Sequence, residues 1–213
     1  MSYSKGFGDA SKMMEENAAA QAARSGAFDF FIKKGESAQL VFLDNEPGAV
    51  VYMYTHKVGD RFEDFICAGS PDEYKGFAKR PTLAAYFTVI QLGEFQGRNG
   101  KVVNPRRTLK VKPQTLDILK RQFAKRGGLR GCVFDVTRSN NDKSPAVGDG
   151  WDFEEKLSED QIAKLNEDTS SIKFEETLKA KERTAEQLFK ILQGQAEEAQ
   201  KTSEAPDKSE VEW

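Results

Sequence analysis

The chain of 213 residues has a net charge of −2, with 38% hydrophobic and 31% charged residues. A low apolar fraction beside a high charged fraction predicts one domain of ordinary size with solvated extensions. No apolar run is long enough to cross a bilayer, and the first residues lack the apolar stretch of a signal peptide. We therefore expect a soluble, cytoplasmic protein that has no membrane contact.

The small net charge hides a strong asymmetry along the chain. Residues 24–148 carry a charge of +8, whereas residues 149–213 carry −9. Positive charge is densest in residues 98–130, where eleven Lys or Arg accompany one acid, Asp117. A basic body with an acidic tail is typical of a polyanion-binding protein whose tail competes for the same surface or recruits partners. The alternative is a tail that only raises solubility.

The chain begins with a predicted flexible arm, residues 1–27, in which 13–24 have high helix propensity. A predicted domain, residues 28–150, follows. Alternating apolar residues and turn signals predict its strands, which we place within 28–43 and at 50–58, 83–92, 101–103, 108–112 and 129–138. Pro113 opens a helix that ends near Lys125, and the connection 59–81 shows no regular pattern. This inventory predicts a mainly β fold, a five-stranded OB-fold-like barrel with one inserted helix.

Beyond Trp151 the composition changes to helix-forming residues. We predict a helical acidic extension over 151–194, with a short helix at 159–165 and a longer one at 174–193. Ser158 and Gln161 match a capping box for the first helix, and Gly194 is expected to end the second. Residues 195–213 lack apolar periodicity, so we expect a disordered acidic C-terminal tail.

The sequence offers little for catalysis. His56 is the only histidine, and no nucleophile accompanies it in a recognisable pattern. A phosphate-binding loop is absent from 93–100, and the acids show no metal-binding spacing. Two distant cysteines, Cys67 and Cys132, do not supply a zinc site or a disulfide scaffold. We therefore expect neither an enzyme nor a bound cofactor or metal.

Nucleic acid is the polyanion that aromatic side chains beside Lys and Arg favour, because rings stack on bases while cations contact phosphates. The predicted phosphate contacts are Arg80, Arg98, Lys101, Arg106, Arg107, Lys110 and Lys112. The predicted stacking residues are Tyr52, Tyr54, Tyr86 and Phe95. The side chains assigned to the core are Phe42, Phe87, Val89 and Phe134. Half-buried packing is the alternative for the tyrosines of strand 50–58, and the helix dipole equally explains the basic end of helix 113–125.

Three runs resemble strands of the single-stranded-DNA-binding proteins of tailed phages: FDFFIKKGESAQLVFL (28–43), RPTLAAYFTV (80–89) and LRGCVFDVTRS (129–139). The resemblance covers about residues 28–150. It implies an OB fold and sequence-nonspecific binding of single-stranded DNA in phage DNA replication, recombination and repair, in the cytoplasm of the host cell. Some of these proteins carry a Cys/His zinc cluster, of which this chain keeps only Cys67 and His56, so we expect no zinc.

The acidic C-terminus with its terminal aromatic residue is also similar to the tails of replicative single-strand binders. This resemblance implies that the last residues, Glu210, Val211, Glu212 and Trp213, dock on replication proteins such as a DNA polymerase, helicase or primase. Two alternatives stay open. One is an interaction adaptor that binds a protein, or a second copy of itself, through helices in 157–193. The other is an RNA-binding protein or a nuclease, although Asp117 is the only acid in the basic stretch that could serve metal-dependent cleavage.

Overall fold

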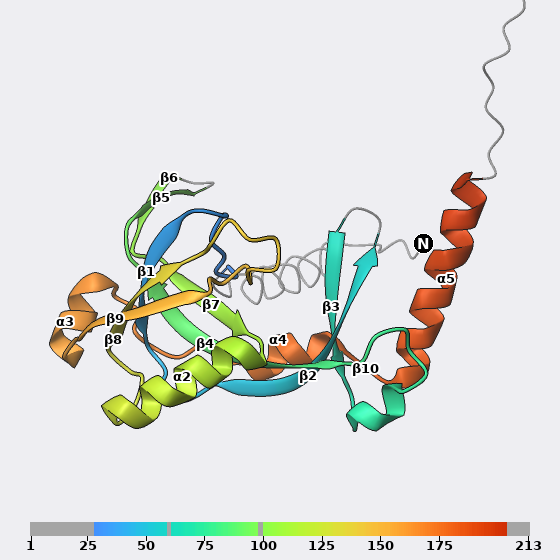
Figure 1. The fold of residues 1–213 in the computed structure, drawn as a ribbon, viewed down its shortest axis with the longest axis horizontal. Helices are drawn as coiled ribbons and strands as arrows, with labels where there is room; N and C mark the ends of the chain where they lie inside the picture. The colour runs from blue at the N-terminus through green and yellow to red at the C-terminus, as the bar shows by residue number, and fades with distance from the viewer. Residues whose placement is uncertain (1–27, 59–60, 98–99, 204–213) are drawn as a thin grey trace, which may run out of the picture. The chain divides into compact units, whose positions relative to one another are not determined.

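The structure is a computed structural model that describes residues 28–58, 61–97 and 100–203, and this part of the chain is mainly β with four α-helices (Figure 1). The chain divides into two compact units. The first comprises the chain up to Val50 together with Ala84–Thr177, and the second comprises Val51–Leu83 together with the chain from Leu178. None of the described helices combines the length and the apolar character that a membrane span requires.

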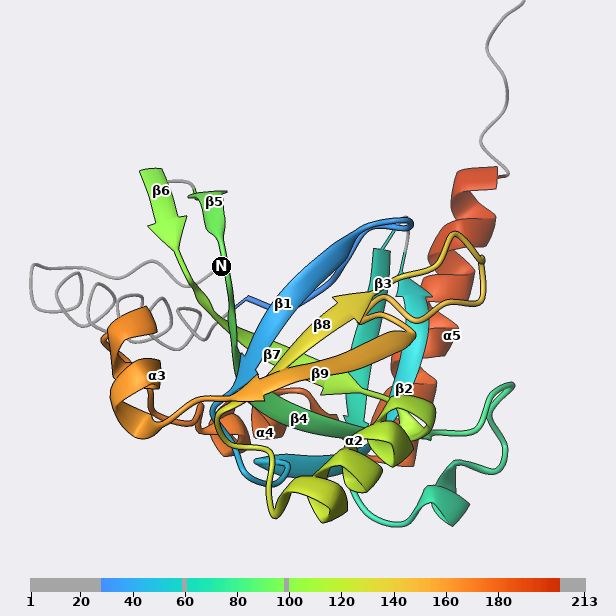
Figure 2. The same ribbon diagram turned by 60° about the vertical axis from the view of Figure 1, so that its left-hand side comes forward.

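The sheet of the first unit is built around strand β1 (Ser37–Phe42). On one side β1 pairs antiparallel with β4 (Thr82–Gln91), and β4 pairs with β7 (Arg106–Val111). On the other side β1 pairs with β8 (Cys132–Thr137), and β8 pairs with β9 (Gly150–Lys156), as Figure 2 shows. The order is therefore β7-β4-β1-β8-β9. In the described chain no ladder joins β7 to β9, so the expectation of a closed barrel is wrong and the sheet is open.

One face of this sheet carries an aromatic core. The Phe42 ring lies 5.5 Å from the Phe87 ring and 5.5 Å from the Phe134 ring, centroid to centroid, and Trp151 packs 6.1 Å from Phe134. Phe42, Phe87, Val89 and Phe134 are almost fully buried, which confirms their assignment to the core. Burial of each such side chain stabilises the fold by about 1.5–3 kcal/mol. Trp151, which we had taken as a domain edge, belongs to β9 and to this core.

The opposite face of β1 is closed by helix α3 (Glu159–Leu165). Ile162 is fully buried against Val41, Leu43, Ile90 and Val133. The predicted capping box is confirmed, because the Ser158 hydroxyl accepts from the Gln161 amide and the Gln161 side chain accepts from the Ser158 amide. Both faces of β1 are thus covered, which explains its run of consecutive apolar residues.

Two further elements complete the first unit. Helix α2 (Pro113–Arg126) confirms the predicted helix, and it ends where Gly127 adopts a left-handed conformation with φ of 64°. Strands β5 (Glu94–Gly97) and β6 (Gly100–Val103) form a separate antiparallel hairpin. This hairpin projects away from the sheet beyond the end of β4 (Figure 2).

The strands β2 (Ala49–Val58), β3 (Arg61–Cys67) and β10 (Glu182–Arg183) continue the same eight-stranded sheet, in the order β10-β3-β2-β4. β2 pairs antiparallel with β3, and the short β10 pairs parallel with β3. The 3-10 helix η1 (Pro71–Tyr74) follows β3. The predicted irregular connection 59–81 is therefore wrong. Its strand escaped prediction because the sequence RFEDFIC places two acids between its aromatic residues.

The predicted helix over 174–193 is interrupted. Helix α4 (Phe174–Ala180) is followed by β10, and α5 (Ala185–Ser203) then starts anew and continues through Gly194. Thr184 and Gln187 exchange capping hydrogen bonds of 3.0 and 3.2 Å at the start of α5. Leu188 of α5 is fully buried against Tyr54, Phe65, Cys67 and Tyr74. The helix therefore completes the core of this unit.

Candidate nucleic-acid interface

A cation lies against two aromatic rings on the first unit. The Arg107 guanidinium carbon lies 5.9 Å from the centroid of the Phe28 ring and 5.6 Å from the centroid of the Phe95 ring. The Phe28 side chain is 77% exposed, and Phe95 is half-buried. We call these three residues the aromatic–arginine cluster.

Backbone pairing fixes Phe28 beside Arg107. The Phe28 carbonyl accepts from the Thr108 amide at 3.1 Å, and the Phe30 amide donates to the Thr108 carbonyl at 2.8 Å. The segment before β1 therefore lies parallel to β7. Phe30 is buried, whereas Phe28 remains 77% exposed although strand alternation would place both side chains on the same side of an extended chain.

The other two members of the cluster are positioned by β4 and by the hairpin that follows it. The Arg107 Nε donates to the Gln91 side chain at 3.2 Å, which holds the guanidinium over the end of β4. Gly93 has φ of 127°, and the Phe95 ring lies close to it. A β-carbon added to Gly93 would lie 3.5 Å from two carbons of that ring. Partial burial lowers the pKa of Arg107, but an arginine remains charged at any physiological pH.

Such a cluster has the chemistry to hold a nucleotide. Phenylalanine rings stack on any base, and a guanidinium binds phosphate through charge-assisted hydrogen bonds or stacks on a base itself. The alternative is a cation–π contact that serves stability alone, which contributes about 0.5–1 kcal/mol at an exposed site. Exposure of the Phe28 ring favours the binding role, because a purely stabilising contact gains little from a ring left open to water.

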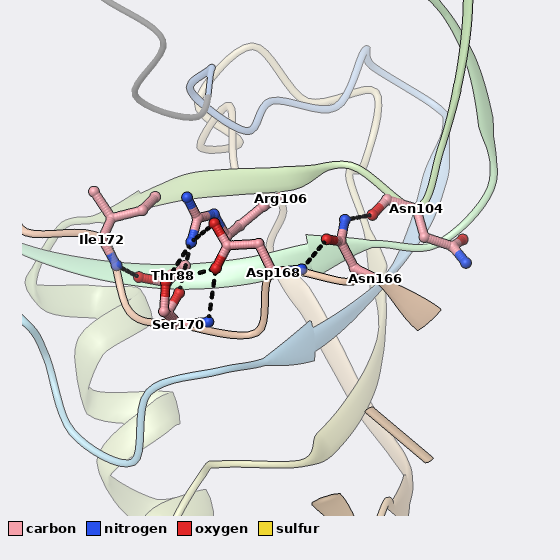
Figure 3. A network of polar contacts seen from close by, with 7 residues as sticks. All are labelled: Thr88, Asn104, Arg106, Asn166, Asp168, Ser170 and Ile172. Carbon is pink, nitrogen blue, oxygen red and sulfur yellow. Dashed lines mark hydrogen bonds and ion pairs between the residues drawn. The ribbon is translucent and has the colours of Figure 1, made fainter. Parts of the chain in front are cut away.

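Arg106, the neighbour of Arg107, points to the other face of β7. Its Nη1 lies 2.6 Å from the Asp168 carboxylate and donates to the backbone and side-chain oxygens of Ser170 at 2.9 Å each (Figure 3). This face carries Tyr86 and Lys110, which are directly paired in the β4–β7 register. Tyr86 is buried, with its ring 5.7 Å from that of Phe174. We therefore leave Tyr86 out of the proposed interface.

The remaining predicted cations of the first unit are more open. Lys101 forms an exposed ion pair of 3.1 Å with Glu94 across the β5–β6 hairpin, which is a weak and exchangeable contact. Lys112 is exposed at the N-cap of α2, and Lys110 is half-buried on β7. Arg98 and the tail residues Glu210, Val211, Glu212 and Trp213 lie outside the described residues.

The three predicted residues on the second unit divide by exposure. Tyr54 is a core residue, packed against Phe77 at a centroid distance of 5.4 Å, and it presents no open face to a base. Tyr52 is 41% exposed and Arg80 is exposed.

Burial raises the pKa of Cys67 to about 11 and that of Tyr74 to about 12, so both groups are neutral at physiological pH.

Sequence reasoning missed Phe28 and Gln91 as parts of the site. Alternation gave no signal for Phe28, because it places residue 28 on the same side as residues 30 and 32, yet Phe30 and Ile32 are buried while Phe28 is exposed. Within the described ranges, no group of three or more His, Cys, Asp or Glu side chains could hold a metal ion. Comparisons of the chain with protein-family models, with curated proteins and with solved structures found no match.

Proposed function

We propose that this protein binds single-stranded DNA without sequence preference. The aromatic–arginine cluster carries the proposal, because it joins an exposed ring and a half-buried ring to a fixed guanidinium on one strand of a basic region. Single strands expose the faces of their bases to such rings, whereas a duplex hides them in its stack. Lys101 and Lys112 add exposed positive charge on the same unit and support contact with phosphates.

The strand connectivity supports an OB-type relationship. Taken along the chain, β1, β4, β7, helix α2, β8 and β9 give five strands with a helix between the third and the fourth. These five strands pair in the order β7-β4-β1-β8-β9; β4 also neighbours β2, and in the described chain no ladder joins β7 to β9. OB folds are partly open, and they bind oligonucleotides on their second and third strands. In this chain those strands are β4 and β7, and β7 holds Arg107.

The resemblance to tailed-phage single-strand binders extends the proposal to a biological role. A protein of this kind protects single-stranded DNA during phage replication, recombination and repair, in the cytoplasm of the host cell. Its acidic end would recruit a polymerase, helicase or primase. Removal of residues 197–213 should abolish such recruitment and tighten DNA binding at low salt, because a competing polyanion is lost. Equal DNA affinity of the full-length and truncated chains would contradict the competition.

The test of the function is a fluorescence anisotropy titration of the full-length protein with labelled oligo(dT), a matched duplex and oligo(U), at several salt concentrations. We expect micromolar or tighter binding to oligo(dT), much weaker binding to the duplex, and an affinity that falls steeply with salt. Equal affinity for duplex and oligo(dT) would contradict the proposal. A clear preference for oligo(U) would indicate an RNA-binding protein instead.

A further inference from the structure

A segment of this chain crosses the outer face of β4 and β7, where Arg106 lies. We call residues 166–172 the strap. At its start the Asn166 side chain donates to the Asn104 carbonyl at 2.8 Å, and at its end the Ile172 amide donates to the Thr88 hydroxyl at 2.8 Å (Figure 3). The strap is thus tied at one end to the turn before β7 and at the other end to β4.

The middle of the strap surrounds the Arg106 guanidinium with oxygens. One carboxylate oxygen of Asp168 lies 2.6 Å from Nη1, and both oxygens of Ser170 accept from the same nitrogen. Ser170 in turn donates to Asp168 from its amide at 3.0 Å and from its hydroxyl at 2.6 Å. These hydrogen bonds, and then the charge of Arg106, lower the pKa of Asp168 and keep it ionised. An anionic group with several acceptors around one guanidinium is also what a DNA phosphate presents.

Buried residues anchor the chain on either side of the strap, whereas the strap itself is weakly held. Ile162 before it and Phe174 after it are buried in the first unit. Between them Glu167, Asp168, Ser170 and Ser171 are exposed, and none of the strap is helix or strand. A segment that buries few apolar groups and is held by exposed polar contacts opens at low cost. The Arg106–Asp168 pair, with the aspartate 54% exposed, is of the kind that salt and competing anions weaken.

We propose that Arg106 is a second phosphate-binding site for single-stranded DNA, and that Asp168 with Ser170 occupies it until the DNA displaces the strap. This inference rests on the proposed function. The face next to the strap carries Thr108 on β7, in register with Thr88 on β4, which accepts from the Ile172 amide. The apparent affinity of this site equals its intrinsic affinity multiplied by the fraction of molecules in which the strap is open. The DNA backbone would thus contact both faces of β7, with Arg107 on one and Arg106 on the other.

The first experiment compares oligo(dT) affinity in full-length Asp168→Asn and Glu167→Gln variants. Both substitutions remove one exposed negative charge from the strap, but only the first removes the partner of Arg106. We expect Asp168→Asn to bind about 3- to 10-fold more tightly than Glu167→Gln at low salt. The logarithm of its binding constant should also fall more steeply with the logarithm of the salt concentration, by the equivalent of about one phosphate contact. The gain should vanish in Asp168→Asn combined with Arg106→Gln. Equal affinities in the two single variants, or a gain that survives in the double variant, would overturn the inference.

A second experiment measures directly whether the strap is displaced. Hydrogen exchange of the peptide that contains Ile172 should become faster when wild-type protein is saturated with oligo(dT), because the amide loses its bond to Thr88. Unchanged or slower exchange would show that the strap stays in place, and the inference would fail while the proposed function stands. If neither the wild type nor Asp168→Asn binds oligo(dT), both proposals fail.

Discussion

Arg106 and Arg107 are consecutive residues of β7 that serve opposite faces of one strand. Arg106 pairs with Asp168 at 2.6 Å, whereas the Arg107 guanidinium lies against the rings of Phe28 and Phe95. Successive side chains of a strand point to opposite faces, so one basic doublet supplies a cation to each side of the sheet. The two arginines should therefore respond differently to mutation.

Arg107→Gln should weaken binding to oligo(dT) by about tenfold and lower the salt slope by about one contact, since a phosphate partner is lost. Arg106→Gln should have a smaller effect in the wild-type background, because Asp168 already occupies its guanidinium. Anisotropy titrations of both single variants at several salt concentrations check this order. An Arg107→Gln variant with wild-type affinity would contradict the role given to the cluster.

The two rings of the cluster should contribute through stacking. Phe28→Ala and Phe95→Ala should each cost about 1–3 kcal/mol of oligo(dT) binding, with the salt slope unchanged because no charge is removed. Phe31→Ala is a matched control, since that ring is 65% exposed and takes no part in the cluster. A loss of affinity in the control as large as in Phe28→Ala would show that exposed rings act without regard to position.

Tyr54 should behave as a core residue and not as a DNA contact. Tyr54→Ala removes a ring that packs with Phe65, Phe77 and Leu188, and we expect it to destabilise the second unit by about 3–5 kcal/mol. Tyr54→Phe keeps the ring and should be nearly neutral. Hydrogen exchange of the β2 and β3 amides provides the measurement. Native-like protection in Tyr54→Ala would contradict the packing described here.

The ion pair between Arg130 and Glu159 should make stability depend on pH. The Arg130 side chain donates to both carboxylate oxygens, at 2.7 and 2.8 Å, which lowers the pKa of Glu159 in the folded state. A lowered folded pKa gives a contribution that is present above the unfolded value of about 4.3 and is lost as the pH falls through the folded pKa.

Denaturant unfolding at a series of pH values tests this dependence. The free energy of unfolding of the wild type should exceed that of Glu159→Gln at pH 7, and the difference should vanish on acidification. The difference should be no more than about 1 kcal/mol, because the ion pair is largely exposed. Asp160→Asn is the control for loss of a charge in the same helical turn. A difference between wild type and Glu159→Gln that persists at low pH would show that charge is not its cause.

Local patterns predicted the elements whose signals lie within one segment. Pro113 and an end near Lys125 located α2, the Ser158–Gln161 pair marked α3, and alternation located β1 and β4. The elements that depend on partners far away in the sequence were not predicted. β3 is a strand with two consecutive acids that gains its partners from β2 and β10, and α5 completes its core from far along the chain.

The candidate site was predicted by residue type but not by geometry. Counting charges marked Arg106 and Arg107 together, whereas their faces depend on the register of β7 with β4. The position of Phe28 depends on a single backbone bridge to Thr108, which no local pattern encodes. The strap belongs to the acidic extension predicted over 151–194. Its Asp168 lies 62 positions after Arg106, so their contact is visible only in the folded chain.

The most direct test of the central claim is to map where DNA touches the protein. Photocrosslinking of oligo(dT) to the full-length wild-type chain, followed by mass spectrometry of the crosslinked peptides, locates the contact without relying on a variant. The account predicts crosslinks in the peptides that contain Phe28 and Phe95, and their loss when unlabelled oligo(dT) competes. Crosslinks that fall elsewhere in the chain and spare both peptides would contradict it.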